Sequence, residues 1–233
     1  MFGSKKIFVD NKTLELSKLE HFAEGGNRAC YIHPEHSALC IKIVKPESIG
    51  ALRAKRSYIR NLHSDAYFDD NVQEYKAYQQ ASIKKYPERI YDHVPRCYGW
   101  QNTDIGAGLV LDYYGQQDGS PSPTLQAYLH THGVTKEIKD KLDQLAVYLQ
   151  ETELLTRNIL THNVVIAQDG RLKIIDGLGA STHFNATTLS KVARRASIKR
   201  RIKRMYLRVE WEVSDKRADW LDIEKNERFI DGA

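Results

Sequence analysis

The sequence predicts an α+β protein of two parts, a small β-rich part followed by a mainly helical part. Extended runs of apolar and β-branched residues dominate up to residue 112, whereas the spacing of amphipathic helices dominates after residue 124. A connector rich in Gly, Ser and Pro, residues 115–123, separates the two patterns. We therefore predict two domains, residues 1–114 and 115–233.

The N-terminal part is predicted to hold three strands, one helix and a hairpin. Alternating or continuous apolar residues indicate strands at residues 14–22, 29–32 and 38–44. The apolar residues of segment 71–85 recur at helical spacing, so this segment is predicted to be a helix. Two further apolar runs, joined by a polar loop, predict a hairpin at residues 94–112.

The C-terminal part is predicted to hold two helices and a second hairpin. A helical pattern at residues 125–130 follows Thr124, which is predicted to cap it, and a longer pattern runs over about residues 135–152. Two short apolar runs, at residues 164–166 and 172–175, flank an Asp-Gly pair. Because Asp-Gly is a strong signal for a tight turn, these runs are predicted to pair as strands.

The last predicted element is a basic helix at residues 189–209. It holds nine cations and no carboxylate, and without it the chain would be net acidic. Its apolar side is predicted to comprise Leu189, Val192, Ala193, Ala196, Met205 and Val209. Three alternatives stay open: a solvated face over a core contact, a surface for an acidic partner or acidic lipid, and a nucleic-acid-binding module. No helix-turn-helix pattern or RNA-binding signature favours nucleic acid.

The composition is typical of an ordinary soluble globular chain. Of the 233 residues, 41% are hydrophobic and 28% are charged, and the apolar runs are far too short to span a membrane. The first six residues lack the apolar stretch of a signal peptide. Cys30, Cys40 and Cys97 show no metal-binding spacing. We therefore expect a cytoplasmic protein with reduced thiols and no transmembrane segment.

A first group of candidate residues is suited to phosphate. Gly25 and Gly26 would let backbone N–H groups approach phosphate oxygens, although two glycines are also typical of a plain β-turn. Lys42 is a lone cation in an apolar strand, and the alternative is an edge-strand lysine that points to water. A buried lysine needs a carboxylate, since an unpaired internal charge is costly. Glu74 is the candidate carboxylate; the alternative is a solvated helix glutamate.

A second group of candidates surrounds the two later strands. Asn158 lies in a short polar loop, Asn163 immediately precedes the first of these strands, and Asp176 follows the second. Amide and carboxylate oxygens are ligands that suit Mg²⁺. Aspartate after a strand is also a common turn residue. The glycines at positions 177 and 179 leave the surroundings of Asp176 open, which favours a functional interpretation.

The order of these features resembles the protein-kinase-like fold, which has a glycine loop, a strand lysine, a helix glutamate, a catalytic-loop asparagine and a later aspartate. More narrowly, residues 14–209 resemble the bacterial YrbL family. The segments that carry this resemblance are Cys30-Tyr31 with His33-Pro34, Cys40–Val44, Val94–Arg96 with Gly99, and the Asn163 loop. That family is known as part of the PhoP regulatory network and as kinase-like.

The resemblance implies a two-lobed fold that binds ATP and Mg²⁺, with a small antiparallel β-sheet lobe and a reduced, mainly helical lobe. It implies that Lys42 holds phosphate and that Glu74 fixes Lys42. It also implies that Asn163 and Asp176 hold the metal. The further nucleotide-binding candidates are Gly25, Gly26, Cys30, Asp112 and Tyr114.

One departure from the kinase pattern bears on catalysis. Asn158 stands where kinases have the aspartate that accepts the substrate proton, so Asn158 and Lys42 are the catalytic candidates. An amide cannot accept that proton, and loss of a general base typically costs about 10²–10⁴ in rate. The segment Gly177-Leu178-Gly179 also differs from the Asp-Phe-Gly motif.

Three functional hypotheses follow from these features. The first is a nucleotide-binding protein with slow or atypical phosphotransfer to a small molecule. The second is an inactive regulatory pseudokinase that acts through a partner protein. The third is a nucleic-acid-binding module that uses the basic helix at residues 189–209. After Gly179 the sequence offers room for that helix and one more, so we do not expect a platform for a protein substrate.

Overall fold

The computed structural model describes residues 8–46, 69–179, 190–215 and 219–223. The contacts within the chain divide it into two compact units. The N-terminal unit comprises residues 1–79 and 95–115, and the C-terminal unit comprises residues 80–94 and 116–233. Segment 80–94, which the sequence analysis placed in the first domain, thus belongs to the C-terminal unit.

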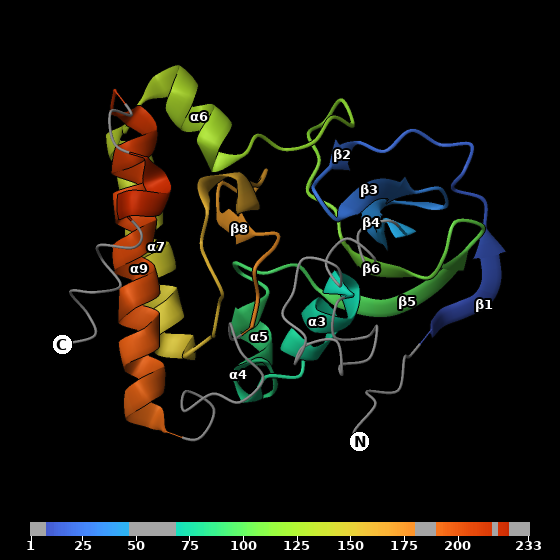
Figure 1. The fold of residues 1–233 in the computed structure, drawn as a ribbon, viewed down its shortest axis with the longest axis horizontal. Coiled ribbons are helices and arrows are strands. Elements are labelled where there is room, and N and C mark those ends of the chain that lie inside the picture. The colour runs from blue at the N-terminus through green and yellow to red at the C-terminus, as the bar shows by residue number, and fades with distance from the viewer. Residues whose placement is uncertain (1–7, 47–68, 180–189, 216–218, 224–233) are drawn as a thin grey trace. The chain divides into compact units, whose positions relative to one another are not determined.

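The N-terminal unit is built on one six-stranded sheet with the strand order β1-β5-β6-β4-β3-β2. Neighbouring strands pair antiparallel except β1 and β5, which pair parallel, so the sheet is mixed where an antiparallel sheet was predicted. The strands are β1 Phe8–Leu14, β2 Ala23–Glu24, β3 Arg28–His33, β4 His36–Val44, β5 Cys97–Thr103 and β6 Gly108–Asp112. Helix α3 (Asp70–Ala77) lies beside this sheet and contacts β4 and β6 (Figure 1).

The first strand lies earlier in the chain than predicted. A strand was expected at residues 14–22, but β1 ends at Leu14 and the chain then turns. The carboxylate of Asp104 accepts hydrogen bonds from the backbone N–H groups of Leu16 (2.7 Å) and Ser17 (3.2 Å) and so holds this turn. The alternation of apolar residues from residue 14 onward nevertheless marked buried positions. Leu14 and Leu16 belong to a core cluster with Ile41, Ile43 and Val110.

The single helix predicted at residues 71–85 is two helices, α3 and α4 (Ala81–Lys85). The break falls at Gln80, whose backbone is extended and whose side chain bonds to Leu155. The amide of Gln80 donates to the carbonyl of Leu155 at 3.2 Å and accepts from its N–H at 2.9 Å. A tertiary contact therefore overrides the helical periodicity here.

The C-terminal unit combines helices with a two-stranded sheet. The predicted hairpin is confirmed as β7 (Val164–Ile166) and β8 (Leu172–Ile174), which pair antiparallel. The two predicted helices are confirmed as α6 (Leu125–His132) and α7 (Lys136–Thr152). Each begins with a threonine whose hydroxyl accepts a backbone N–H; the sequence predicted this cap for α6, and the cap of α7 was not predicted. The short helix α5 (Pro87–Ile90) and the 3₁₀ helix η2 (Thr161–Asn163) also belong to this unit.

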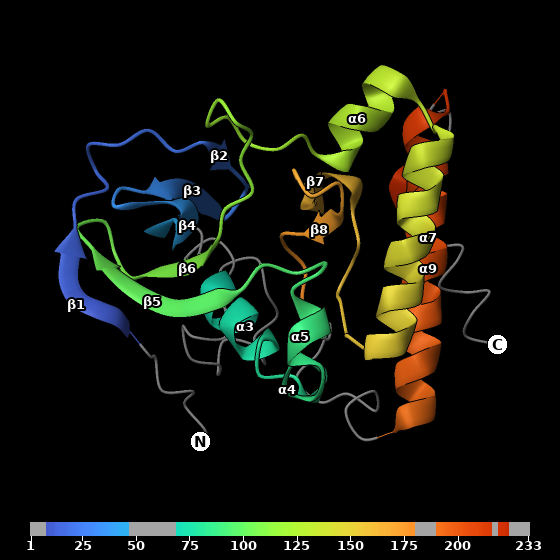
Figure 2. The same cartoon turned by 180° about the vertical axis from the view of Figure 1, so that it is seen from behind.

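The predicted basic helix is α9 (Lys191–Val213), which lies alongside α7 (Figure 2). Its buried apolar side consists of Ile198, Ile202, Met205 and Val209. The prediction was right for Met205 and Val209 but wrong for Val192, which is 79% exposed, and for Ala196, which is also exposed. Leu189 lies outside the described residues. The buried residues recur at the spacing of one helix face from residue 198 onward. The apolar side predicted from the sequence therefore began too early in the chain.

The α+β class is confirmed by the six-stranded sheet, the two-stranded sheet and the helices. In the part of the chain that the structure describes, no helix combines the length and the apolar character needed to cross a bilayer. The kinase-like organisation of the two domains stays a prediction.

Candidate functional site

Lys42 lies in the interior of the N-terminal sheet. Its strand, β4, is flanked by β3 and β6, so the alternative of an edge-strand lysine is wrong. Lys42 is 7% exposed and Glu74 on α3 is 4% exposed. The Nζ atom of Lys42 donates to both carboxylate oxygens of Glu74, at 2.8 Å and 3.0 Å. The solvated alternative for Glu74 is therefore also wrong, and the expected pairing of the two side chains is present.

The start of α3 fixes how Glu74 meets the sheet. The carboxylate of Asp69 caps the helix by accepting the N–H groups of Asn71 (2.8 Å) and Val72 (3.0 Å). The side-chain amide of Asn71 donates to the backbone carbonyl of Lys42 at 2.7 Å, so the first turn is tied to β4. Glu74 follows Asn71 by three residues and hence faces the same strand.

Arg28 is a second cation on Glu74 that the sequence analysis missed. Its Nη1 group forms an ion pair with the carboxylate of Glu74, and its side chain is only 11% exposed. Arg28 and Cys30 lie two residues apart on β3, and Cys30 pairs with Lys42 in register. Residues two apart share one face of a strand, so Arg28 and Lys42 reach the same carboxylate. The alternation was visible in the sequence, but the register was not.

The glycine pair forms the turn between β2 and β3. The N–H of Gly25 donates to the carbonyl of Arg28 at 2.8 Å, so a backbone hydrogen bond closes the connection between the two strands. A Cβ atom on Gly26 would meet no atom within 4 Å. Neither observation tests phosphate binding, which stays a prediction for both glycines.

The segment at the end of β6, which holds the nucleotide-binding candidates Asp112 and Tyr114, is engaged within the sheet. The backbone N–H of Asp112 donates to Arg96, and that of Tyr113 donates to Ala38. The carboxylate of Asp112 accepts the N–H of Arg96 and the hydroxyl of Tyr98, both at 2.8 Å. A nucleotide base at this segment would therefore have to form hydrogen bonds with groups other than these two N–H donors. A role for Asp112 or Tyr114 in nucleotide binding stays a prediction.

Two of the three cysteines of this unit, Cys40 and Cys97, have surroundings that make them unreactive. Cys30, Cys40 and Cys97 form no disulfide bonds. Burial raises the pKa of Cys40 to about 12, and burial likewise raises the pKa of Cys97 to about 12. Thiolates are the reactive form, so these two residues are structural. Cys30, the nucleotide-binding candidate, is half-buried on β3.

In the C-terminal unit, the hairpin brings the two metal-ligand candidates to neighbouring positions. The N–H of Ile175 donates to the carbonyl of Asn163 at 2.9 Å, one step beyond the Val164–Ile174 pair. Asp176 is the next residue, and its carboxylate accepts its neighbour's N–H at 2.6 Å. Among the described residues, no group of three or more His, Cys, Asp or Glu side chains is placed to hold a metal. Two oxygen donors fit Mg²⁺, which usually keeps waters and takes phosphate oxygens.

Asn158 is held against this hairpin end. The N–H of Arg157 donates to the carbonyl of Gly177 at 2.6 Å. Gly177 has a φ of +85°, and a Cβ atom there would lie 2.8 Å from the carbonyl oxygen of Asn158. Only glycine therefore fits this close approach. The side-chain oxygen of Asn158 accepts a hydrogen bond from Nη1 of Arg201 on α9, at 2.8 Å.

A buried carboxylate, Glu212, joins α9 to the loop that follows Asn158. Glu212 is 3% exposed and accepts hydrogen bonds from the Thr161 hydroxyl (2.9 Å) and the Arg208 Nε (2.9 Å). The side chains of Gln126 and His130 on α6 also contact it, at 3.0 Å and 2.9 Å. Glu212 was not predicted from the sequence, although it continues the buried spacing of residues 198, 202, 205 and 209.

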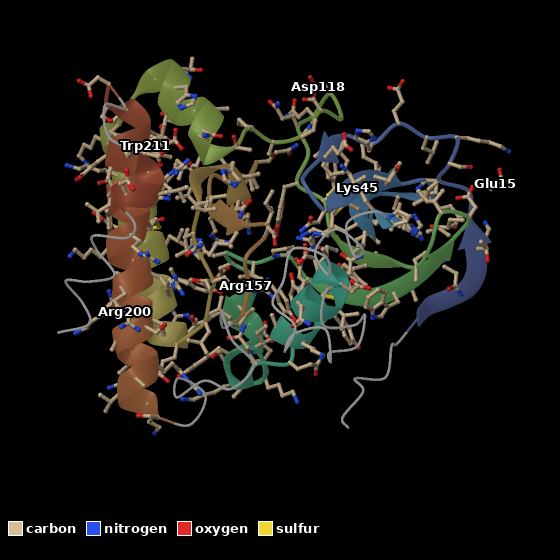
Figure 3. All side chains as sticks on the ribbon, in the orientation of Figure 1. Glu15, Lys45, Asp118, Arg157, Arg200 and Trp211 are labelled. Carbon is tan, nitrogen blue, oxygen red and sulfur yellow. The ribbon has the colours of Figure 1, made fainter. Side chains whose placement is uncertain are left out.

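The cations of α9 are not one uniform surface. Arg194 and Arg195 pair with Glu153, Arg201 bonds to Asn158, and Arg208 bonds to Glu212. The exposed cations are Lys191, Arg195, Lys199, Arg200 and Lys203; Arg200 and, further along the same helix, Trp211 are labelled in Figure 3. Four of the nine cations thus make these contacts inside the unit and five are exposed, with Arg195 in both groups.

The fold and these residues define an α+β protein with a buried lysine–glutamate pair in one unit and an asparagine–aspartate pair at a hairpin end in the other. The chain belongs to the family described as PhoP regulatory network protein YrbL, whose family model matches residues 14–210. The family predicted from the sequence is therefore confirmed.

Two curated relatives are both called "Uncharacterized protein YrbL", one from Escherichia coli (strain K12) and one from Shigella flexneri. Each is 28% identical to this chain over 185 residues, which cover 76% of this chain and 79% of the relative.

Proposed function

We propose that this protein binds a purine nucleotide with Mg²⁺ and has the protein-kinase-like fold that its sequence resembles. The observation that carries the proposal is the buried pair of Lys42 and Glu74, with Nζ 2.8 Å from the carboxylate. In kinases, a strand lysine held by a helix glutamate positions the phosphates of ATP. Glu74 would fix the Lys42 side chain, and Lys42 would hold phosphate oxygens.

The metal part of the proposal rests on Asn163 and Asp176. The bond between the carbonyl of Asn163 and the N–H of Ile175 supports it, because it holds the two candidate ligands at adjacent positions. Bound Mg²⁺ would neutralise phosphate charge in this arrangement. The side chains of Asn163 and Asp176 would supply two of its oxygen ligands.

The chemistry that follows nucleotide binding depends on Asn158. Phosphoryl transfer relies mainly on positioning and charge neutralisation, so loss of the base slows it without abolishing it. The side-chain oxygen of Asn158 is, however, already engaged by Arg201 at 2.8 Å. We therefore propose slow transfer to a small-molecule hydroxyl as the first candidate. The second is a regulatory pseudokinase, which the engaged Asn158 favours.

A thermal-shift titration with ATP, with and without Mg²⁺, tests nucleotide binding. A ligand that binds the folded state raises the melting temperature by mass action. Lys42→Met and Asp176→Ala should each abolish the shift if both residues serve one ligand. Lys45→Met is the matched control. Lys45 directly follows β4, pairs with Glu24 and is not one of the proposed nucleotide-binding residues. A wild-type protein without any shift would end the proposal.

Single-turnover release or transfer of the γ-phosphate separates the enzyme from the pseudokinase. Asn158→Asp alone would place a carboxylate against Arg201, which would lower its pKa and make it a weak base. The informative variant is therefore Asn158→Asp combined with Arg201→Met. Faster transfer in the double variant than in either single variant supports a competent loop. Equal rates in all three, at the buffer background, favour the pseudokinase.

The exposed cations of α9 support a separate candidate, a surface for an acidic partner or nucleic acid. Lys199, Arg200 and Lys203 face solvent within one stretch of the helix. Binding to DNA or RNA by these residues would weaken steeply with salt. Neutralising all three to glutamine should remove that binding while leaving the ATP shift intact.

A further inference from the structure

A buried hydroxyl in the N-terminal unit has no hydrogen-bond partner. Tyr78 caps the C-terminus of α3 and is 7% exposed. Its hydroxyl oxygen is shielded from water, and none of the described residues donates to it or accepts from it. A buried hydroxyl without a partner destabilises the folded state, because it has lost its hydrogen bonds to water. Such a group calls for an explanation, and a ligand that supplies the missing partner is one.

The other polar side chains on this face of α3 have partners on strand β4. Asn71, Glu74 and Tyr78 follow each other at intervals of three and four residues, so they share one face of the helix. Asn71 donates to the backbone carbonyl of Lys42 at 2.7 Å, and Glu74 accepts from Nζ of Lys42 at 2.8 Å. Tyr78 lies one turn beyond Glu74 and makes no such bond. The unpartnered hydroxyl therefore belongs to the same row of side chains that holds Lys42.

The neighbours of this hydroxyl link the Lys42 region to the end of β6. Burial, followed by the nearby side chains of Glu74, Cys97 and Tyr114, raises the pKa of Tyr78 well above its ordinary value of 10. The hydroxyl therefore keeps its proton at neutral pH and is available as a hydrogen-bond donor.

Tyr114 is the neighbour that can admit a ligand to the hydroxyl. Glu74 and Cys97 belong to α3 and β5, which are held by their own backbone hydrogen bonds. Tyr114 lies beyond the end of β6 and is only half-buried. A side chain outside the regular elements moves aside at lower cost than one within them. The approach to Tyr78 is therefore from the end of β6.

We propose that the Tyr78 hydroxyl donates to a ring nitrogen of the purine base of the nucleotide bound at Lys42. The inference rests on the proposed nucleotide function and deepens it, because it assigns recognition of the base to a residue outside the set predicted from the sequence. Lys42 would hold the phosphates, and Tyr78 would hold the base on the side of Tyr114. A site with a polar group placed for one ligand rejects ligands that leave this group unpaired.

The substitution Tyr78→Phe tests whether the hydroxyl lacks a partner in the free protein. The melting temperature without ligand should rise by about 2–4 °C, because an unpaired buried group is removed and no bond is lost. Tyr148→Phe is the matched control, since the buried hydroxyl of Tyr148 donates to the carbonyl of Ile90 at 2.9 Å. That variant should melt about 2–4 °C lower than the wild type. An equal decrease in both variants would mean that Tyr78 has a partner, and would overturn the inference.

Calorimetric titration of the full chain with ATP and with tripolyphosphate, both with Mg²⁺, tests the contact with the base. Tyr78→Phe should weaken ATP binding about five- to tenfold, the usual worth of one hydrogen bond, and leave tripolyphosphate within about twofold. Lys42→Met should weaken both probes, because the phosphates are common to them. Tyr148→Phe should bind both as the wild type does.

The outcomes separate this inference from the nucleotide function. Equal ATP affinity in the wild type and in Tyr78→Phe would overturn the inference and leave nucleotide binding intact. An equal loss for ATP and tripolyphosphate in Tyr78→Phe would also overturn it, because the hydroxyl would then act on the phosphate end through Lys42 and Glu74. A wild-type protein that binds neither probe would instead end the nucleotide proposal itself, and the inference with it.

Discussion

Among the residues that the structure describes, each unit contains one buried carboxylate, Glu74 and Glu212, and the two are used differently. Glu74 contacts two cations, Lys42 and Arg28, which come from two neighbouring strands. Glu212 contacts one arginine, four residues earlier on its own helix, and three side chains from α6 and η2. Both carboxylates are almost fully buried, at 4% and 3% exposed.

The difference shows that a buried carboxylate can have either of two roles, to hold a helix in place or to orient cationic side chains. The donors around Glu212 come from three elements of the C-terminal unit, so its role is to hold α9 in place. The donors around Glu74 are the long side chains of Lys42 and Arg28, which it orients on one face of the sheet. We therefore expect loss of Glu212 to affect stability first, and loss of Glu74 to affect ligand binding first.

Glu212→Ala should have the largest effect on stability. It leaves Arg208 mostly buried without its carboxylate, and removing one partner of a buried pair costs roughly 3–5 kcal/mol. The measurement is urea unfolding followed by the fluorescence of Trp211 and Trp220 in a Trp100→Phe background. Glu210→Ala, at an exposed position on the same helix, is the control. A loss below about 1 kcal/mol would mean that Arg208 reaches water and that Glu212 is no anchor.

Glu74→Ala should cost less, about 1.5–3 kcal/mol, because Lys42 and Arg28 end in long side chains that can turn toward water. Lys42→Met alone should cost less again, since Arg28 still pairs with Glu74. The fluorescence of Trp100 reports on this region, because its ring lies 5.9 Å from that of Tyr75 on α3. Adding Lys42→Met to Glu74→Ala should restore part of the lost stability. Simple additivity of the two changes would argue against their coupling.

Glycines in the two units provide a matched pair of substitutions. Gly177→Ala should cost about 1–3 kcal/mol, because its φ is +85° and its Cβ atom would lie 2.8 Å from the Asn158 carbonyl. Gly26→Ala should change the free energy of unfolding by no more than about 0.5 kcal/mol, since a Cβ atom there meets nothing. Thermal unfolding compares the two variants. Loss of the ATP shift in a fully stable Gly26→Ala protein would point to ligand contact at that turn.

The smallest effect concerns pH and falls on the C-terminal unit. Burial lowers the pKa of His93 below its ordinary value of 6.5. Below that pH, His93 binds a proton in the unfolded chain but stays neutral in the folded unit until the pH is lower. The free energy of unfolding therefore decreases as the pH falls. The slope for one proton cannot exceed about 1.4 kcal/mol per pH unit. Urea unfolding near pH 7.5 and near pH 5.5 measures it, and His93→Gln should flatten the slope. An unchanged slope in that variant would assign the effect to other groups.

Features that depend on local sequence were predicted from the sequence alone. The threonine cap of α6 and the Asp-Gly hairpin both follow from residues that are close in the chain. Local rules suffice there because a cap or a tight turn involves only a few neighbouring residues. The strand that carries Lys42 and the helix that carries Glu74 were predicted for the same reason.

Contacts between distant residues were decided by the tertiary structure. Arg28 meets Glu74 across 46 residues of chain, Arg201 meets Asn158 across 43, and Glu212 meets Thr161 across 51. Each contact depends on the register of a strand or the rotation of a packed helix, and a one-residue shift would turn the side chain to another face. Local helix and strand propensities do not determine on which face a side chain lies. The sequence therefore determined most of the elements, and packing decided where α3 ends and which charges the elements share.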